Sequence, residues 1–89
     1  MASFEWRSQP LGLASQSPER VTQRIAALLR KERERQDLSV NRLAQESGVD
    51  RRAIGRIEAG ERIPSILTLL KITQALGVEL PSLIQNAEN

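Results

Sequence analysis

The chain has 89 residues, with 13 Lys and Arg against 11 Asp and Glu, and it contains no Cys and no His. This length suffices for one small domain, and the lack of Cys and His excludes disulfides and most zinc or catalytic-metal sites, so we expect neither a metal nor a cofactor. No stretch approaches the roughly 18 apolar residues of a membrane span, and no basic start followed by an apolar run is present, so we expect a soluble cytoplasmic protein without a membrane partner.

Positive charge is concentrated in the middle of the chain. Residues 20–62 hold eleven basic and seven acidic residues, a net of +4, whereas residues 1–19 and 63–89 each come to −1. Most of the basic residues are arginine, whose guanidinium matches phosphates and guanine edges better than an ammonium group does. An ordinary solvated helical surface has a similar composition, so charge alone does not identify nucleic acid as the partner.

Residues 1–16 are expected to form a flexible N-terminal tail, because Pro10, Gly12 and several serines interrupt any helical period. The tail nevertheless contains the only two aromatic residues of the chain, Phe4 and Trp6. It is either a disordered leader or a segment that docks on its own domain or on a second subunit.

The first helix is predicted to begin after Ser17 and to run to about Gln36. Ser17 is a good N-cap, and Pro18 and Glu19 suit the first helical turn. Four apolar residues follow the i, i+4, i+7, i+8 spacing of one helix face, namely Val21, Ile25, Leu28 and Leu29.

Two short helices are predicted next. Ser39 caps a second helix from Val40 to about Ser47, in which Leu43 and Ala44 point inward. After a turn at Gly48, Asp50 caps a third helix from Arg51 to about Ala59, which Gly60 ends. The inner face of this third helix is expected to consist of Ala53, Ile54 and Ile57.

Two further helices complete a domain over residues 17–85, and residues 86–89 are expected to be frayed. Pro64 breaks the chain, Ser65 caps a fourth helix from Ile66 to Leu76, and Pro81 opens a short fifth helix. The buried face of the fourth helix is expected to comprise Ile66, Leu69, Leu70, Thr73 and Leu76. Five helices with no strand pattern predict an all-α fold.

Residues 39–60 have the sequence form of a helix-turn-helix, with a short turn centred on Gly48 and the small Ala44 where the two helices cross. The segment 38–78 in addition resembles the DNA-binding domain of the Cro and lambda-repressor family, also called XRE-type. The matching features are Leu38-Ser39, Leu43-Ala44, Gly48-Val49, Ile54, Glu58-x-Gly60, Pro64 and Ala75-Leu76-Gly77-Val78, and the first helix extends the match to about residues 17–84. The resemblance implies a compact five-helix lambda-repressor-like domain, with the helix-turn-helix at helices two and three, that binds double-stranded DNA.

In this family the second helix of the motif lies in the major groove with its N-terminal residues at the base edges. The resemblance therefore implies that Arg51, Arg52 and Arg56 read bases, since arginine binds O6 and N7 of guanine bidentately. For Arg52 a phosphate contact is an equal alternative. Gly55 costs about 1 kcal/mol relative to Ala within a helix, and it either permits close approach to the duplex or is a tolerated exposed glycine.

The predicted helix at residues 40–47, which is the first helix of the motif, is expected to lie across the phosphates, because the free N–H groups at its start favour an anion. At the position of Val40 the family commonly has Gln, whose side chain contacts a phosphate and braces the third helix. Valine cannot form these hydrogen bonds, so Asn41, Arg42 or the backbone are expected to substitute. The expected phosphate contacts are Ser39, Val40, Asn41, Arg42, Arg62 and Ser65.

Arg33 and Glu58 fall at positions that the family often joins by a partly buried ion pair between the first and third helices. The resemblance implies that this pair is structural here. Removing one partner of a buried pair can cost about 3–5 kcal/mol, far more than removing one from an exposed pair.

The sequence predicts a transcriptional regulator, specifically a repressor, that binds a palindromic operator as a homodimer. Three base-reading arginines contact too few base pairs for a useful site in a genome, which is the reason for expecting a dimer. Leu80, Leu83 and Ile84 are the predicted dimer contacts, with the tail as a second candidate, although Leu83 is equally suited to closing the core.

Two alternatives stay open, an antitoxin that binds DNA and a toxin partner, and a protein-interaction module of the same fold that does not bind DNA. Arginines on the outer face of the third helix disfavour the interaction module, because a protein-docking face is more often apolar. An enzyme is not expected, since the chain lacks His, Cys and Tyr and shows neither a carboxylate pair nor a Gly-rich phosphate loop with Lys.

Overall fold

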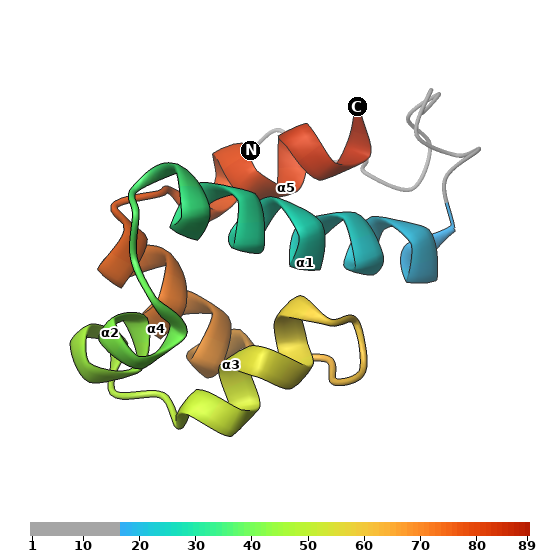
Figure 1. Ribbon diagram of the computed structural model, residues 1–89. Coiled ribbons are helices and arrows are strands. Elements are labelled where there is room, and N and C mark those ends of the chain that lie inside the picture. The colour runs from blue at the N-terminus through green and yellow to red at the C-terminus, as the bar shows by residue number, and fades with distance from the viewer. Residues whose placement is uncertain (1–16) are drawn as a thin grey trace, which may run out of the picture.

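The structure, a computed structural model, describes residues 17–89, so the predictions for the tail and for Phe4 and Trp6 lie outside the described residues. Five helices make up the described part (Figure 1). Their bounds are Pro18–Arg35 (α1), Val40–Ser47 (α2), Arg51–Glu58 (α3), Ile66–Leu76 (α4) and Leu80–Glu88 (α5). The predicted all-α class is confirmed, and the predicted ends of the first four helices hold to within one residue.

Four of the five helices begin at the cap that the sequence indicates. In each, the side-chain oxygen of the N-cap residue accepts a hydrogen bond from a backbone N–H of the first turn. A cap of this kind contributes about 1 kcal/mol. The cap and N–H donor pairs are Ser17 with Arg20, Ser39 with Arg42, Asp50 with Arg52, and Ser65 with Thr68.

The long helix α1 lies between two groups of helices. Figure 1 shows α5 beside α1 on one side and α2, α3 and α4 on the other. The α2–α3 pair is thereby held at the end of the domain farthest from α5, and it faces solvent.

The core is built from aliphatic side chains of all five helices. The largest fully buried side chains come from α1 to α4 and are Leu29, Leu43, Ile54, Ile57, Ile72 and Thr73. Helix α5 adds Leu83, which is 5% exposed, and Ala87, which is completely buried. Each fully buried Leu or Ile contributes about 1.5–3 kcal/mol, so the domain depends on good packing of a small core.

The buried face of α4 differs from the prediction. Ile66 is 73% exposed and Leu70 is 36% exposed, whereas Ile72, which the prediction omitted, is only 1% exposed. Because α4 is apolar at most positions, more than one face has the spacing of a buried stripe, and periodicity does not select between them. The contacts of α4 with α2 and α1 bury the face that contains Ile72, Thr73 and Leu76.

The C-terminal helix also differs from the prediction. It begins at Leu80, with Pro81 inside the first turn, and it continues to Glu88. The fraying predicted for residues 86–89 is not observed up to Glu88, because Ala87 is buried and α5 packs against α1. Within residues 17–89 no single helix is long and apolar enough to cross a membrane, and only α4 and α5 taken as a pair, bent by 102°, would reach that length.

The connection from α1 to α2 contains a feature that the sequence analysis did not predict. Asp37 has a φ of 59°, the left-handed conformation that Asp adopts more readily than most residues. The preceding Gln36 donates a hydrogen bond from Nε2 to the carbonyl of Leu76 at 2.7 Å. The end of α1 is therefore fixed to the end of α4 before the chain enters the helix-turn-helix.

Candidate nucleic-acid interface

Helices α2 and α3 are joined by a tight turn that orients α3. Gly48 ends α2 with a φ of 74°, a left-handed conformation that favours glycine. Val49 in the turn is buried, and the Asp50 carboxylate then caps α3 at the Arg52 N–H at 3.2 Å. On one side of α3, Ala53, Ile54 and Ile57 are buried in the core. The opposite side of α3 is therefore held rigidly towards solvent.

The predicted base-reading residues lie on this solvent-facing side. Arg51, Arg52, Gly55 and Arg56 are all exposed. Within residues 17–89 none of the three arginines forms an ion pair with a carboxylate, whereas Arg30, Arg35 and Arg42 each do. Their positive charges are thus available to an external anion.

Arg51 is the only one of these three arginines with a side-chain hydrogen bond inside the described part of the chain. Its Nη1 donates to Oδ1 of Asn41 over a long 3.4 Å. Asn41, Gln45 and Asp50 line a shallow hollow between α2 and α3 together with Arg51. The first turns of α2 and α3 are therefore adjacent, so a duplex contacting α3 would also lie close to the start of α2.

The phosphate contacts predicted on α2 occupy different environments. Ser39 and Asn41 are exposed, and the Ser39 hydroxyl oxygen already accepts the N–H of Arg42. The Val40 side chain is half-buried and packs against the core, so only its backbone N–H, free at the start of a helix, suits the predicted contact. Arg42 binds Glu46 at 2.8 Å in an exposed pair, which contributes little and can be exchanged for a phosphate at small cost.

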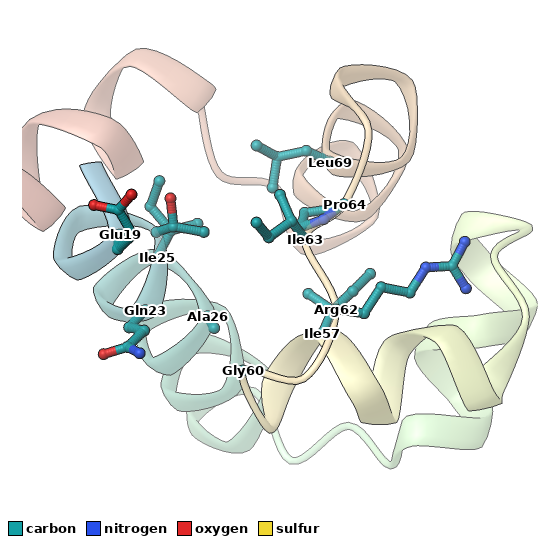
Figure 2. A pocket seen from close by; sticks show the side chains of 11 residues that line it. Glu19, Gln23, Ile25, Ala26, Ile57, Gly60, Arg62, Ile63, Pro64 and Leu69 are labelled. Carbon is teal, nitrogen blue, oxygen red and sulfur yellow. The ribbon is translucent and has the colours of Figure 1, made fainter.

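The connection between α3 and α4 carries the last two predicted phosphate contacts. Arg62 is exposed, and Figure 2 shows its side chain directed away from α1. The Ser65 hydroxyl accepts the Thr68 N–H at 3.0 Å and also lies 3.0 Å from Oγ1 of Thr68. Because the cap of α4 engages this hydroxyl, Arg62 is the better placed of the two for a phosphate.

Neither the backbone conformation nor the surroundings of residue 55 require a glycine there. Its φ lies outside the left-handed range, and a Cβ added to it would meet nothing within 4 Å. The sequence left open whether this glycine is merely tolerated or permits close approach of a ligand. The free space at Gly55 shows that packing within the domain does not explain it.

Arg33 and Glu58 form the bridge that the sequence indicated. Arg33 donates from Nε to Glu58 Oε2 at 2.8 Å and from Nη2 to Oε1 at 3.0 Å, and the two side chains are only 11% and 7% exposed. Nη1 donates in addition to the Leu38 carbonyl at 2.6 Å. Hydrogen bonds to Glu58 raise the pKa of Arg33. The bridge connects α1, Leu38 before α2 and the last residue of α3, so it fixes the orientation of α3.

The three residues predicted for the dimer interface are not equally accessible. Leu83 is 5% exposed and belongs to the core, which agrees with the alternative that it closes the core and leaves it poorly placed for a dimer contact. Leu80 is half-buried against the core, and Ile84 is 36% exposed. The structure instead exposes apolar side chains on and before α4 that the sequence analysis did not select, namely Ile63, Ile66 and Leu67. Apolar residues are normally expected to be buried, so the sequence pattern did not predict that these three are exposed.

The residues that the structure describes contain no group of three or more His, Cys, Asp or Glu side chains placed to hold a metal ion. The carboxylates Asp50 and Glu46 of the α2–α3 face are engaged by the Arg52 N–H and by Arg42, and the face also carries guanidinium, amide and hydroxyl groups and free backbone N–H groups. Groups of this kind donate hydrogen bonds to phosphate oxygens and to the acceptor edges of bases.

Comparison with known proteins identifies the family of the chain. The helix-turn-helix family model HTH_3 matches residues 29–83. The restriction-modification controller protein C.AhdI from Aeromonas hydrophila is 35% identical, with a TM-score of 0.65 over 71% of this chain and 94% of that chain. An HTH_3 family transcriptional regulator from Vibrio cholerae is 33% identical, with a TM-score of 0.71 over 79% of this chain and 39% of that chain. No curated protein matches the chain. The match over more than half of the chain confirms the predicted XRE-type family, and the protein belongs to the HTH_3 helix-turn-helix family.

Proposed function

We propose that this protein is a sequence-specific, double-stranded DNA-binding transcriptional regulator that inserts α3 into the major groove. The observation that carries the proposal is the arrangement of α3. Among the residues that the structure describes, Arg51, Arg52 and Arg56 face solvent without carboxylate partners, while the opposite side of the helix is anchored in the core. The similar structures, a restriction-modification controller protein and a transcriptional regulator, support this function.

The three arginines divide by their position on α3. Arg51 and Arg52 occupy the first turn, which in this geometry faces the base edges, and Arg56 lies one turn further on. A bidentate arginine–guanine contact contributes roughly 1–3 kcal/mol of discrimination. Arg51, at the first position of α3 and with its Nη1 3.4 Å from Asn41 Oδ1 of α2, is assigned to a guanine.

The phosphate backbone would be held from both elements that flank α3 in the chain. The first N–H groups of α2 and the exposed Asn41 precede α3, and the exposed Arg62 follows it in the α3–α4 connection. Contacts of this type fix the register of the helix without reading sequence.

We further propose a homodimer that represses transcription from a palindromic operator. Three arginines per chain reach only a few base pairs, and a second copy doubles the site. The half-sites would then lie roughly 34–36 Å apart, one turn of the duplex. Ile84 and the edge of Leu80 remain as proposed contacts on α5, since Leu83 is buried.

Selection of bound duplexes from a random DNA pool at a stated salt concentration tests this function. We expect inverted half-sites with at least one guanine at a contacted position, and loss of the selected motif with the Arg51→Gln variant. Recovery of only A/T-rich half-sites would refute the arginine assignments. A folded protein that enriches no sequence would refute DNA reading and favour a protein-interaction module.

A further inference from the structure

An apolar groove lies between the first half of α1 and the connection from α3 to α4 (Figure 2). Its volume is about 280 Å³, close to the lower end of the roughly 300–1,000 Å³ typical of small-molecule pockets. The apolar side chains that line it are Ile25, Ala26, Ile57, Ile63, Pro64 and Leu69. The groove lies outside the α2–α3 turn and contains none of the proposed base-reading residues; Arg62, a proposed phosphate contact, lies at its edge.

The groove is incompletely covered. Ala26 and Ile57 at its base are 7% and 1% exposed, but Ile63 at its edge is 75% exposed. Figure 2 shows Ile63 and Leu69 on one side of the groove, across from Glu19 and Ile25 of α1. An exposed isoleucine alone needs no explanation, but one beside an apolar hollow gives an additional apolar group a place to bury.

The chain itself supplies the matching apolar groups. Its two aromatic residues, Phe4 and Trp6, both lie in residues 1–16, and residues 17–89 contain none. We propose that residues 1–16 dock in this groove of their own chain, with Trp6 as the main buried side chain. A tryptophan is the side chain that gains most from such a site, because its ring is large and apolar and its N–H can stay at the polar edge.

The connection between the tail and the groove makes this docking feasible. The groove begins at Glu19, only two residues after the described part of the chain starts at Ser17. Ala26 lies nine residues beyond Ser17 along α1, which is about 14 Å at the helical rise. Trp6 and Ser17 are separated by eleven residue steps, which span up to about 36 Å when extended, so Trp6 can reach the groove without full extension of the chain. A short tether also holds the side chain at an effective concentration on the order of millimolar.

Trp6 provides its own probe, because it is the only Trp in a chain without Tyr. The fluorescence of the full-length protein is compared with that of a synthetic peptide of residues 1–16. Docking predicts a blue-shifted emission maximum and weaker acrylamide quenching in the protein than in the peptide. The comparison is made without DNA, so its outcome does not depend on the proposed regulator function.

Two matched variants locate the site. Ile63→Glu places a charge at the edge of the groove on a residue that is 75% exposed, so the core remains intact. Leu67→Glu makes the same change on a residue that is 63% exposed but does not line the groove. We expect Ile63→Glu to return the emission and the quenching to the peptide values and Leu67→Glu to leave them unchanged, with circular dichroism confirming the fold of both.

A second measurement detects docking through the side chains that line the groove. Trp6→Ala is expected to shift the methyl NMR resonances of Ile25 and Ile63, because the ring current of the docked indole is lost, and to leave Leu67 unchanged. Peptide-like emission in the wild-type protein would overturn the proposal, as would a response to Leu67→Glu equal to that of Ile63→Glu. A blue shift that disappears on dilution would also overturn it, because the tail would then dock on a second copy.

Discussion

The Arg33–Glu58 bridge gives the sharpest prediction for stability. Glu58→Gln removes the carboxylate charge but keeps the size of the side chain and one acceptor oxygen. Breaking a buried pair from one side costs about 3–5 kcal/mol. Arg33 is 11% exposed and keeps its hydrogen bond to the Leu38 carbonyl, so we expect the lower end of that range, a loss of about 3 kcal/mol in the free energy of unfolding.

A loss of this size is large for the domain. A chain of this length is stabilised by only about 0.05–0.15 kcal/mol per residue, and in a domain of 60–100 residues each kcal/mol shifts Tm by about 4–8 °C. We therefore expect Glu58→Gln to lower Tm by roughly 12–24 °C. Urea titrations followed by circular dichroism at 222 nm, in parallel with thermal melts, measure the change.

Glu46→Gln is the matched control. It makes the same substitution in the Arg42–Glu46 pair, whose side chains are 63% and 38% exposed, and we expect it to cost less than about 0.5 kcal/mol. The double variant Arg33→Met with Glu58→Met should recover part of the stability lost in Glu58→Gln, because no unpaired charge is left buried. If Glu58→Gln destabilised the protein no more than Glu46→Gln, the structural role of the bridge would be refuted.

The remaining predictions concern DNA binding. Arg51→Gln should weaken binding to a selected site by about 1–3 kcal/mol and relax its preference at one position, while Arg30→Gln on α1 should not, and equal losses in gel-shift titrations would contradict the assignment. Gly55→Ala should raise the free energy of unfolding by roughly 0.5–1 kcal/mol, because a Cβ has free space there, yet weaken DNA binding if the duplex approaches this face; unchanged affinity would show a merely tolerated glycine. Arg62→Gln should weaken binding to all sequences alike and reduce the salt slope by about 1, and a change in sequence preference would exclude a phosphate role. Ile84→Glu should shift the sedimentation coefficient towards a monomer, and an unchanged coefficient would place the dimer interface elsewhere.

Local signals in the sequence were sufficient for the helices and for the helix-turn-helix. Caps such as Ser39 and Asp50 and the left-handed glycine at position 48 act over a few residues, so their effect can be predicted without knowing the tertiary structure. The spacing of apolar residues on α3 likewise separated its anchored side from its exposed side, because charged residues occupy the exposed positions.

Features that depend on packing between distant segments could not be predicted in this way. The apolar pattern of α4 allows several buried faces, and only its contacts with α1 and α2 select Ile72 over Ile66. Leu83 and Ala87 are buried because α5 lies along α1, a contact between the two ends of the described chain. The groove beside Ile63 has the same origin, since α1 and the α3–α4 connection form it jointly.

The central claim is that α3 binds the DNA major groove through its arginines, and the salt dependence of DNA affinity tests it most directly. The dissociation constant for a selected duplex is measured at several salt concentrations, for the wild-type protein and for the variant Arg51→Gln/Arg52→Gln/Arg56→Gln. If the bound protein neutralises at least four phosphates, the logarithm of the association constant (1/Kd) falls against log salt with a slope of about −3.6 or steeper, and the triple variant binds far more weakly at every salt concentration. Affinity that is independent of salt, or a folded triple variant that binds as tightly as the wild-type protein, would contradict the claim.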